Sequence, residues 1–177
     1  MKRVLILSSS PRKGGNSDLL CDALAEGARE AGHEVTKIRL ADRRIGYCVG
    51  CYACKALKHC VQQDDAAAVL EAMLAADVIV LASPVYFYSV SAQLKALFDR
   101  SVAIYPNLTN KAYVFLATMA DTEERMLSGT FTAMQGFLDC YDGSTLVAKL
   151  GVPGVYAPGE VRATGALEKA RAIGRAL

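Results

Sequence analysis

Short apolar runs alternate along the chain with segments whose apolar residues have helical spacing. This alternation of strand-like and helix-like segments is typical of α/β proteins built on a parallel sheet. A chain of 177 residues, of which 53% are hydrophobic, is long and apolar enough to bury one core. We therefore predict a single domain over residues 1–177, with an irregular cysteine-rich loop at about residues 41–63.

The five expected strands differ in how apolar they are. Three are unbroken apolar runs, which suits strands covered by helices on both faces, whereas the second and fifth carry charged residues. Charged strands suit sheet edges, so we predict the doubly wound order 2-1-3-4-5 rather than 3-2-1-4-5. The expected strands cover residues 4–7, 35–40, 78–82, 112–117 and 146–150, and the expected helices cover residues 17–31, 65–74, 92–101, 121–140 and the segment from 164 onward.

Three of the expected helices have candidate capping residues at their starts. Ser17 precedes the first helix, and Asp64 or Asp65 precedes the second. Asp121 with Glu124 resembles a capping box before the fourth helix.

The predicted strand order reverses between strands one and three. In such sheets a crevice opens at the carboxyl ends of the strands on either side of the reversal. We expect three loops to line that end of the sheet, namely residues 8–17, the cysteine-rich segment and residues 83–91.

The segment after the first expected strand has the composition of a phosphate-binding loop. Residues 8–17 read SSSPRKGGNS and lead directly into a helix. The free N–H groups at a helix start attract a phosphate, and Arg12 can add a charge-assisted contact. The loop is neither a P-loop nor a G-x-G-x-x-G dinucleotide loop. An ordinary polar loop with a serine cap is the alternative.

Three aromatic residues follow the third expected strand, in the segment SPVYFY at residues 83–88. Such residues can stack on a flat ring, although core or subunit-interface packing would use them equally well. Because this loop faces the phosphate loop across the expected crevice, the two together predict a site for a mononucleotide with a large ring.

Four of the six cysteines lie close together, with the spacing C-x2-C-x2-C-x5-C. Thiolates at this spacing can surround an iron–sulfur cluster, whereas structural zinc usually draws on two separated pairs. A loop of free thiols is the alternative. The four residues are Cys48, Cys51, Cys54 and Cys60. The isolated Cys21 and Cys140 are expected to be buried as small apolar residues.

Together these segments resemble the flavodoxin-fold NAD(P)H-dependent FMN reductases, in the branch that includes the iron–sulfur flavoproteins. The matching features are SPRKGGNS at residues 10–17, the cysteine spacing followed by two aspartates, and SPVY at residues 83–86 with parts of residues 91–100. The resemblance implies a flavodoxin-like three-layer fold, FMN as cofactor, NAD(P)H as co-substrate and a [4Fe–4S] cluster on the four cysteines. It also implies a homodimer or homotetramer with the flavin near the subunit interface.

The resemblance also assigns roles within the flavin site. Residues 10–17 would hold the FMN phosphate, and residues 84–87 would contact the isoalloxazine, with Tyr86 as the best candidate for stacking. The segment 118–121 would approach the ring from the far side, although Met-Ala-Asp replaces the glycine-bearing turn common in relatives. The residues so assigned are Ser10, Arg12, Asn16, Ser17, Pro84, Val85, Tyr86, Phe87, Thr118 and Asp121.

These features favour an oxidoreductase that passes electrons from NAD(P)H through FMN to a small acceptor such as a quinone or free flavin. The flavin carries the chemistry, so no catalytic side chain is expected. The alternative is an electron carrier that exchanges electrons with a ferredoxin-like partner. In it, the cluster would lie close to the flavin, because the loops after strands one and two would be neighbours. A domain that binds another phosphorylated ligand is the third option.

Charge and hydropathy argue against two other kinds of partner. A net charge of +2 offers little electrostatic attraction for nucleic acid. The longest uncharged stretch, residues 78–94, contains serines, a proline and a glutamine, so it does not fit a membrane span. The apolar run at residues 4–7 is too short for a signal peptide. We expect a cytoplasmic protein without nucleic-acid or membrane partners.

Overall fold

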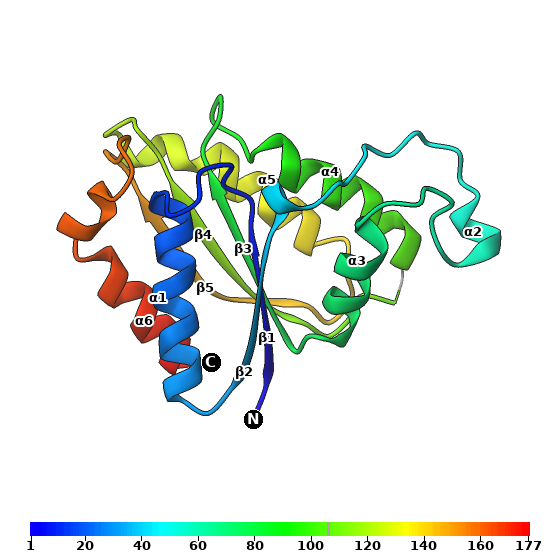
Figure 1. The fold of residues 1–177 in the computed structure, drawn as a ribbon, viewed down its shortest axis with the longest axis horizontal. Coiled ribbons are helices and arrows are strands. Elements are labelled where there is room, and N and C mark those ends of the chain that lie inside the picture. The colour runs from blue at the N-terminus through cyan, green and yellow to red at the C-terminus, as the bar shows by residue number, and fades with distance from the viewer. Residues whose placement is uncertain (106) are drawn as a thin grey trace.

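The computed structural model describes residues 1–105 and 107–177, and its centre is a five-stranded parallel sheet (Figure 1). The order of the strands is β2-β1-β3-β4-β5, so the predicted fold class is confirmed. The order reverses between β1 and β3, as expected. The strands are β1 (Arg3–Ser8), β2 (Glu34–Arg39), β3 (Val78–Pro84), β4 (Ala112–Thr118) and β5 (Thr145–Val152).

Helices cover both faces of the sheet (Figure 1). One face carries α1 (Asn16–Glu30) and α6 (Ala166–Arg175), and the other carries α3 (Ala66–Ala75), α4 (Ala92–Arg100) and α5 (Ser128–Leu138). The short α2 (Cys54–Leu57) lies outside these layers, in the cysteine-rich segment. In the described parts of the chain, no helix combines the length and apolarity needed to cross a bilayer.

Each face of the sheet has its own apolar core, as the period of two along a strand requires. In β1, Leu5 and Leu7 face the core under α3, α4 and α5, whereas Val4 and Ile6 face the core under α1 and α6. All four side chains are buried. β1 therefore contributes side chains to both cores, which explains its unbroken apolar run.

The predicted caps of α1 and α5 are wrong. α1 begins at Asn16 with Gly15 as its N-cap, and the Ser17 hydroxyl lies 2.7 Å from the Thr118 hydroxyl instead of capping the helix. α5 begins only at Ser128, because residues 124–127 form a 3-10 turn. Asp121 accepts the N–H of Glu123 at 2.9 Å within the preceding turn. In both cases a tertiary or local partner takes the group that the sequence pattern assigns to the cap.

α1 and α6 approach each other closely at two glycines. A Cβ atom on Gly27 would overlap the carbonyl oxygen of Arg171, and one on Gly174 would overlap that of Leu24. These obstacles are backbone atoms, so a side chain at either position would force the helices apart.

Gly27→Ala should therefore lower the free energy of unfolding by about 1–3 kcal/mol, as overpacking does in a well-packed core. Gly136→Ala is the matched control, because Gly136 lies in α5 and an added Cβ would meet nothing within 4 Å. The control should raise the free energy of unfolding by about 0.5–1 kcal/mol through its helix propensity. Urea unfolding of both variants checks the prediction, and effects of the same sign would contradict it.

Candidate functional site

A cavity of about 180 Å³ opens at the carboxyl ends of β1, β3 and β4, where the strand order reverses. Four segments line it: the loops after β1, β3 and β5, and the end of β4 together with Ala120. Most of the residues assigned to FMN by resemblance meet here, whereas Phe87 and Asp121 do not line the cavity. Those that do are Ser10, Arg12, Asn16, Ser17, Pro84, Val85, Tyr86 and Thr118.

Buried serines join the loop after β1 to the loop after β3. The backbone N–H and the hydroxyl of Ser9 both donate to the Ala82 carbonyl, at 2.9 and 2.8 Å. The hydroxyl of Ser91, at the start of α4, donates to the Ser9 hydroxyl at 2.8 Å. These bonds fix the separation of the two walls before any ligand binds.

Asp18 braces the loop after β1 from inside, with a side chain only 4% exposed. Its carboxylate accepts the Ser8 hydroxyl at 2.8 Å and the Gly14 N–H at 2.9 Å. It also pairs with Lys37 at 2.7 Å and Arg39 at 2.9 Å, both on the edge strand β2. Burial would raise the pKa of Asp18, but the hydrogen bonds from Lys37, Gly14 and Ser8 outweigh it and lower the pKa to about 2.

The cavity has two groups that attract an anion. α1 starts without a side-chain cap, which leaves its first-turn N–H groups for a bound phosphate. Arg12 lies at the cavity mouth, where its guanidinium donates to the Tyr156 carbonyl at 2.9 Å and lies 5.4 Å from the centre of that ring. A helix start and a guanidinium on one cavity suit a phosphate ester.

Asn16 and Ser17 join the walls of the cavity. The Asn16 amide donates to the Ala157 carbonyl at 3.0 Å, and its oxygen accepts the N–H groups of Gly159 and Val161 at 3.0 and 3.2 Å. Ser17 contacts the end of β4 through the Thr118 hydroxyl. Their assignment to the phosphate stays a prediction, and the structure gives both side chains a second role in holding the cavity together.

The loop after β3 forms a tight hairpin. Tyr86 and Ser89 exchange two backbone hydrogen bonds of 3.0 Å, and the two residues between them, Phe87 and Tyr88, have positive φ angles of 49° and 58°. Such a two-residue turn is usually made by Asn and Gly. Tyr86 lines the cavity, whereas the Phe87 side chain at the tip is fully exposed. Asp121 accepts the Tyr88 hydroxyl at 3.4 Å. Flavin contacts by Phe87 and Asp121 stay predictions.

The cavity wall from the loop after β5 was not predicted. Val155 and Tyr156 line the cavity, and Glu160 holds their loop by accepting the N–H groups of Tyr156 and Ala157 at 2.6 and 2.9 Å. A signal existed in the sequence, because the carboxyl ends of all parallel strands meet at one edge of the sheet. The Pro/Gly-rich segment at residues 153–159 follows the fifth expected strand, so its position at this edge could have been predicted.

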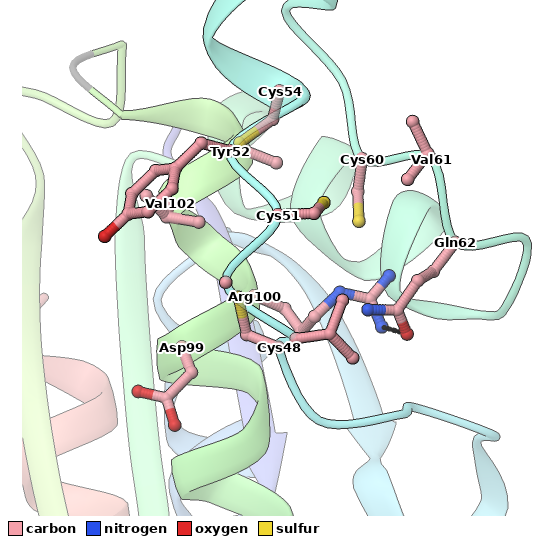
Figure 2. A pocket seen from close by; sticks show the side chains of 13 residues that line it. Cys48, Cys51, Tyr52, Cys54, Cys60, Val61, Gln62, Asp99, Arg100 and Val102 are labelled. Carbon is pink, nitrogen blue, oxygen red and sulfur yellow. Dashed lines mark hydrogen bonds between the residues drawn. The ribbon is translucent and has the colours of Figure 1, made fainter.

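The four clustered cysteines line a second pocket, of about 280 Å³ (Figure 2). All four are free thiols. Within residues 1–105 and 107–177, no three His, Cys, Asp or Glu side chains are arranged to hold a metal ion. Four thiols around one pocket fit the ligand chemistry of an iron–sulfur cluster, and the cluster stays a prediction.

The segment with these cysteines does not line the β1/β3 cavity, so that expectation is wrong. The two pockets share no lining residue. The cysteine pocket lies at the carboxyl end of α4, whereas the cavity lies near its start, and α2 is at the end of the molecule far from α1 (Figure 1). Within one chain, a cluster in this pocket would therefore not lie close to a flavin in the cavity.

An ion pair between Asp64 and Arg100 explains this placement. Asp64 accepts two bonds from Arg100, at 2.6 and 3.0 Å, and the Gly46 N–H at 2.9 Å, which ties the segment to α4. It also accepts the Ala66 N–H at 3.0 Å, so the predicted contact with the start of α3 exists beside the ion pair. Burial would raise the pKa of Asp64, but these hydrogen bonds, with that of Arg100 foremost, hold it below its usual value.

The two isolated cysteines differ. Cys21 is fully buried in the core under α1, so the prediction of burial is confirmed, and this burial raises its pKa to about 12. Cys140 is exposed, and its thiol donates to the Gly136 carbonyl at 3.2 Å, so the prediction of burial is wrong. It lies two residues beyond the end of α5 and directly before the buried Tyr141.

The fold and the cavity together define a class: flavodoxin-like proteins with a cavity at the strand-order reversal. Residues 2–126 match the family described as NADPH-dependent FMN reductase. The chain belongs to this family, which confirms the resemblance stated from the sequence.

Curated relatives include archaeal iron–sulfur flavoproteins. One from Archaeoglobus fulgidus is 42% identical over 100 residues, covering 56% of this chain and 45% of that protein. One from Methanocaldococcus jannaschii is 46% identical over 99 residues, covering 56% and 51%. The chain thus spans about half the length of the curated relatives it matches.

Solved structures show the same fold across the whole chain. An NAD(P)H:quinone oxidoreductase from Methanothermobacter marburgensis has a TM-score of 0.75 at 22% identity, covering 98% of this chain and 94% of that chain. An azoreductase from Bacillus anthracis has a TM-score of 0.77 at 16% identity and covers both chains fully, at 100%. At such low sequence identities the similarity establishes the fold alone.

Proposed function

We propose that the protein binds FMN in the cavity at β1, β3 and β4 and passes electrons from NAD(P)H to a small acceptor such as a quinone or free flavin. The observation that carries this proposal is that an uncapped helix start and the Pro84–Tyr86 wall line one cavity. Membership of the NADPH-dependent FMN reductase family supports it.

The residues of the cavity would bind and shield the cofactor. The first-turn N–H groups of α1 and the Arg12 guanidinium would offset the charge of the phosphate. Pro84, Val85 and Tyr86 would exclude water from one face of the ring. Bound FMN would supply the redox chemistry, in which NAD(P)H gives up a hydride and the acceptor gains two electrons and two protons, the second proton coming from water.

An anaerobic spectrum with and without reductant tests this proposal. Protein purified or reconstituted with FMN should show flavin bands that bleach on addition of NADPH or NADH and return when a quinone is added. A colourless protein that takes up no FMN on reconstitution would refute the proposal.

Arg12→Ala should weaken FMN binding about tenfold, because a charge-assisted hydrogen bond at an exposed site contributes roughly 1.4 kcal/mol. Lys13→Ala is the matched control, since Lys13 is an exposed cation next in sequence that does not line the cavity. Its affinity for FMN should change less than threefold or so, within the usual weight of exposed charges. Flavin fluorescence titration measures both. Equal losses in the two variants would show that loop charge in general, rather than Arg12, attracts the phosphate.

A second candidate is an electron carrier that contains FMN and a [4Fe–4S] cluster and exchanges electrons with a ferredoxin-like protein. Four free thiols around one pocket favour it, as does the likeness to proteins named iron–sulfur flavoproteins. If neither NADPH nor NADH reduces the bound flavin but reduced ferredoxin does, the result would favour this candidate over the reductase.

A further inference from the structure

A buried guanidinium lies against the cysteine pocket. The Arg100 side chain, at the end of α4, is 1% exposed. Its two terminal nitrogens bind Asp64, and Nη1 also donates to the Gly46 carbonyl at 3.0 Å and to Gln62 Oε1 at 3.3 Å. Its third nitrogen, Nε, is buried and has no hydrogen-bond partner among the described residues. A buried donor without a partner costs free energy of folding.

The ion pair is oriented with its positively charged partner at the pocket. Arg100 lines the pocket with the four cysteines, whereas Asp64 does not line it and instead accepts the N–H groups of Gly46 and Ala66. Figure 2 shows the Cys60 sulfur pointing towards the guanidinium. The positive end of the pair therefore faces the thiols, and the negative end is held away from them.

Charge placed in this way matters for one-electron chemistry. When a cluster held by four thiolates takes up an electron from a reductant such as dithionite, it becomes one unit more negative, and no bond to the protein forms or breaks. A fixed positive charge with little exposure to water favours the more negative state. Net charge and hydrogen bonding around the sulfurs are main determinants of cluster potential.

We propose that Arg100 is a positioning residue that raises the reduction potential of a [4Fe–4S] cluster bound by Cys48, Cys51, Cys54 and Cys60, and that Asp64 limits this effect. The inference rests on the cluster-binding part of the proposed function. If the ion pair is purely structural, removing either charge should change only the stability of the protein. If its role is electrostatic, removing the negative charge should raise the reduction potential and removing the positive charge should lower it.

Four variants of the FMN-loaded, anaerobically reconstituted protein separate these roles. Asp64→Asn keeps a hydrogen-bonding side chain and removes the negative charge. The double variant Asp64→Asn with Arg100→Gln removes both charges and avoids a buried carboxylate without a partner. Arg100→Lys keeps the positive charge. Arg3→Gln is the matched control, because it removes one positive charge from the exposed ion pair with Asp77.

Two properties are measured. The first is the iron and sulfide content, and the second is the midpoint potential of the cluster, which EPR monitors during titration with dithionite. Asp64→Asn should raise the ratio of reduced to oxidised cluster at fixed ambient potential about tenfold, a shift of about 59 mV for a one-electron couple. The double variant should lie about tenfold below Asp64→Asn. Arg100→Lys should retain iron, and Arg3→Gln should match the wild type.

The outcomes divide cleanly. Iron lost from the double variant but kept by Arg100→Lys would support the role of the charge, as would the opposed shifts. Full iron content with an Asp64→Asn ratio within twofold of the wild type would overturn the role of Arg100. So would a double variant whose ratio matches that of Asp64→Asn, or iron lost from both Arg100 variants. A wild-type protein that binds FMN but no iron would overturn the cluster assignment and this inference with it, and would leave the FMN reductase proposal standing.

Discussion

Replacement of Cys51 by alanine should abolish iron binding by the anaerobically reconstituted protein. Cys51 is the middle thiol of the three at x2 spacing, so its loss leaves too few ligands for a four-thiolate cluster. Because its side chain is exposed, the change removes little packing, and the fold should persist. FMN content should be unchanged, since the cavity at β1 and β3 shares no lining residue with the cysteine pocket.

Iron and sulfide per chain, together with the visible spectrum, measure this effect. Cys140→Ala is the matched control, because Cys140 is also an exposed free thiol but lies outside the pocket. The control should bind as much iron as the wild type. Iron retained by Cys51→Ala, or lost equally from both variants, would show that the metal is held elsewhere or nonspecifically.

Asp18→Ala should lower the free energy of unfolding by about 3–5 kcal/mol, the usual cost of breaking a buried ion pair from one side. The change leaves Lys37 and Arg39 largely buried without this partner, and it removes the acceptor of the Ser8 hydroxyl and the Gly14 N–H. FMN affinity should fall with stability, because the same carboxylate braces the phosphate loop.

Denaturant unfolding measures this loss, with Asp99→Ala as the control. Asp99 pairs with Lys95 one helical turn away on the exposed side of α4, where such pairs contribute about 0.3–0.5 kcal/mol. A loss of similar size in the two variants would contradict the structural role given to Asp18.

The same carboxylate makes stability depend on pH. The pKa of Asp18 is about 2 in the folded protein, against 3.8 for an unperturbed aspartate, so its ionised form favours folding. This contribution, about 2 kcal/mol, is fully present above the unfolded pKa and is lost as the pH falls through 4 towards 2. The difference in stability between the wild type and Asp18→Ala should therefore shrink over that range.

Strand polarity was enough to predict the sheet. The uncharged runs at Val4–Leu7 and Val78–Ala82 are buried on both faces, and the charged residues Lys37 and Lys149 lie on the two edge strands. Because ligand sites in such sheets follow from the strand order, the positions of the phosphate loop and of the loop after β3 could be predicted as well.

Features that depend on long-range partners could not be predicted. The place of the cysteine segment is decided by Asp64 and Arg100, which lie 36 residues apart and carry no mark of pairing in the sequence. Ser17 has the identity of a cap, but the Thr118 hydroxyl, 101 residues away, is its partner. Phe87 is aromatic like its neighbours, and only the backbone turn shows that it points to solvent.

The wall formed by Val155 and Tyr156 comes after residue 126, where the match to the family ends. The cavity is therefore built from a stretch that matches the family and a stretch that lies beyond the match. The two stretches are hydrogen-bonded to each other, through Arg12 with Tyr156 and through Asn16 with Ala157, so a change in the later stretch would also reach the side chains at the start of α1.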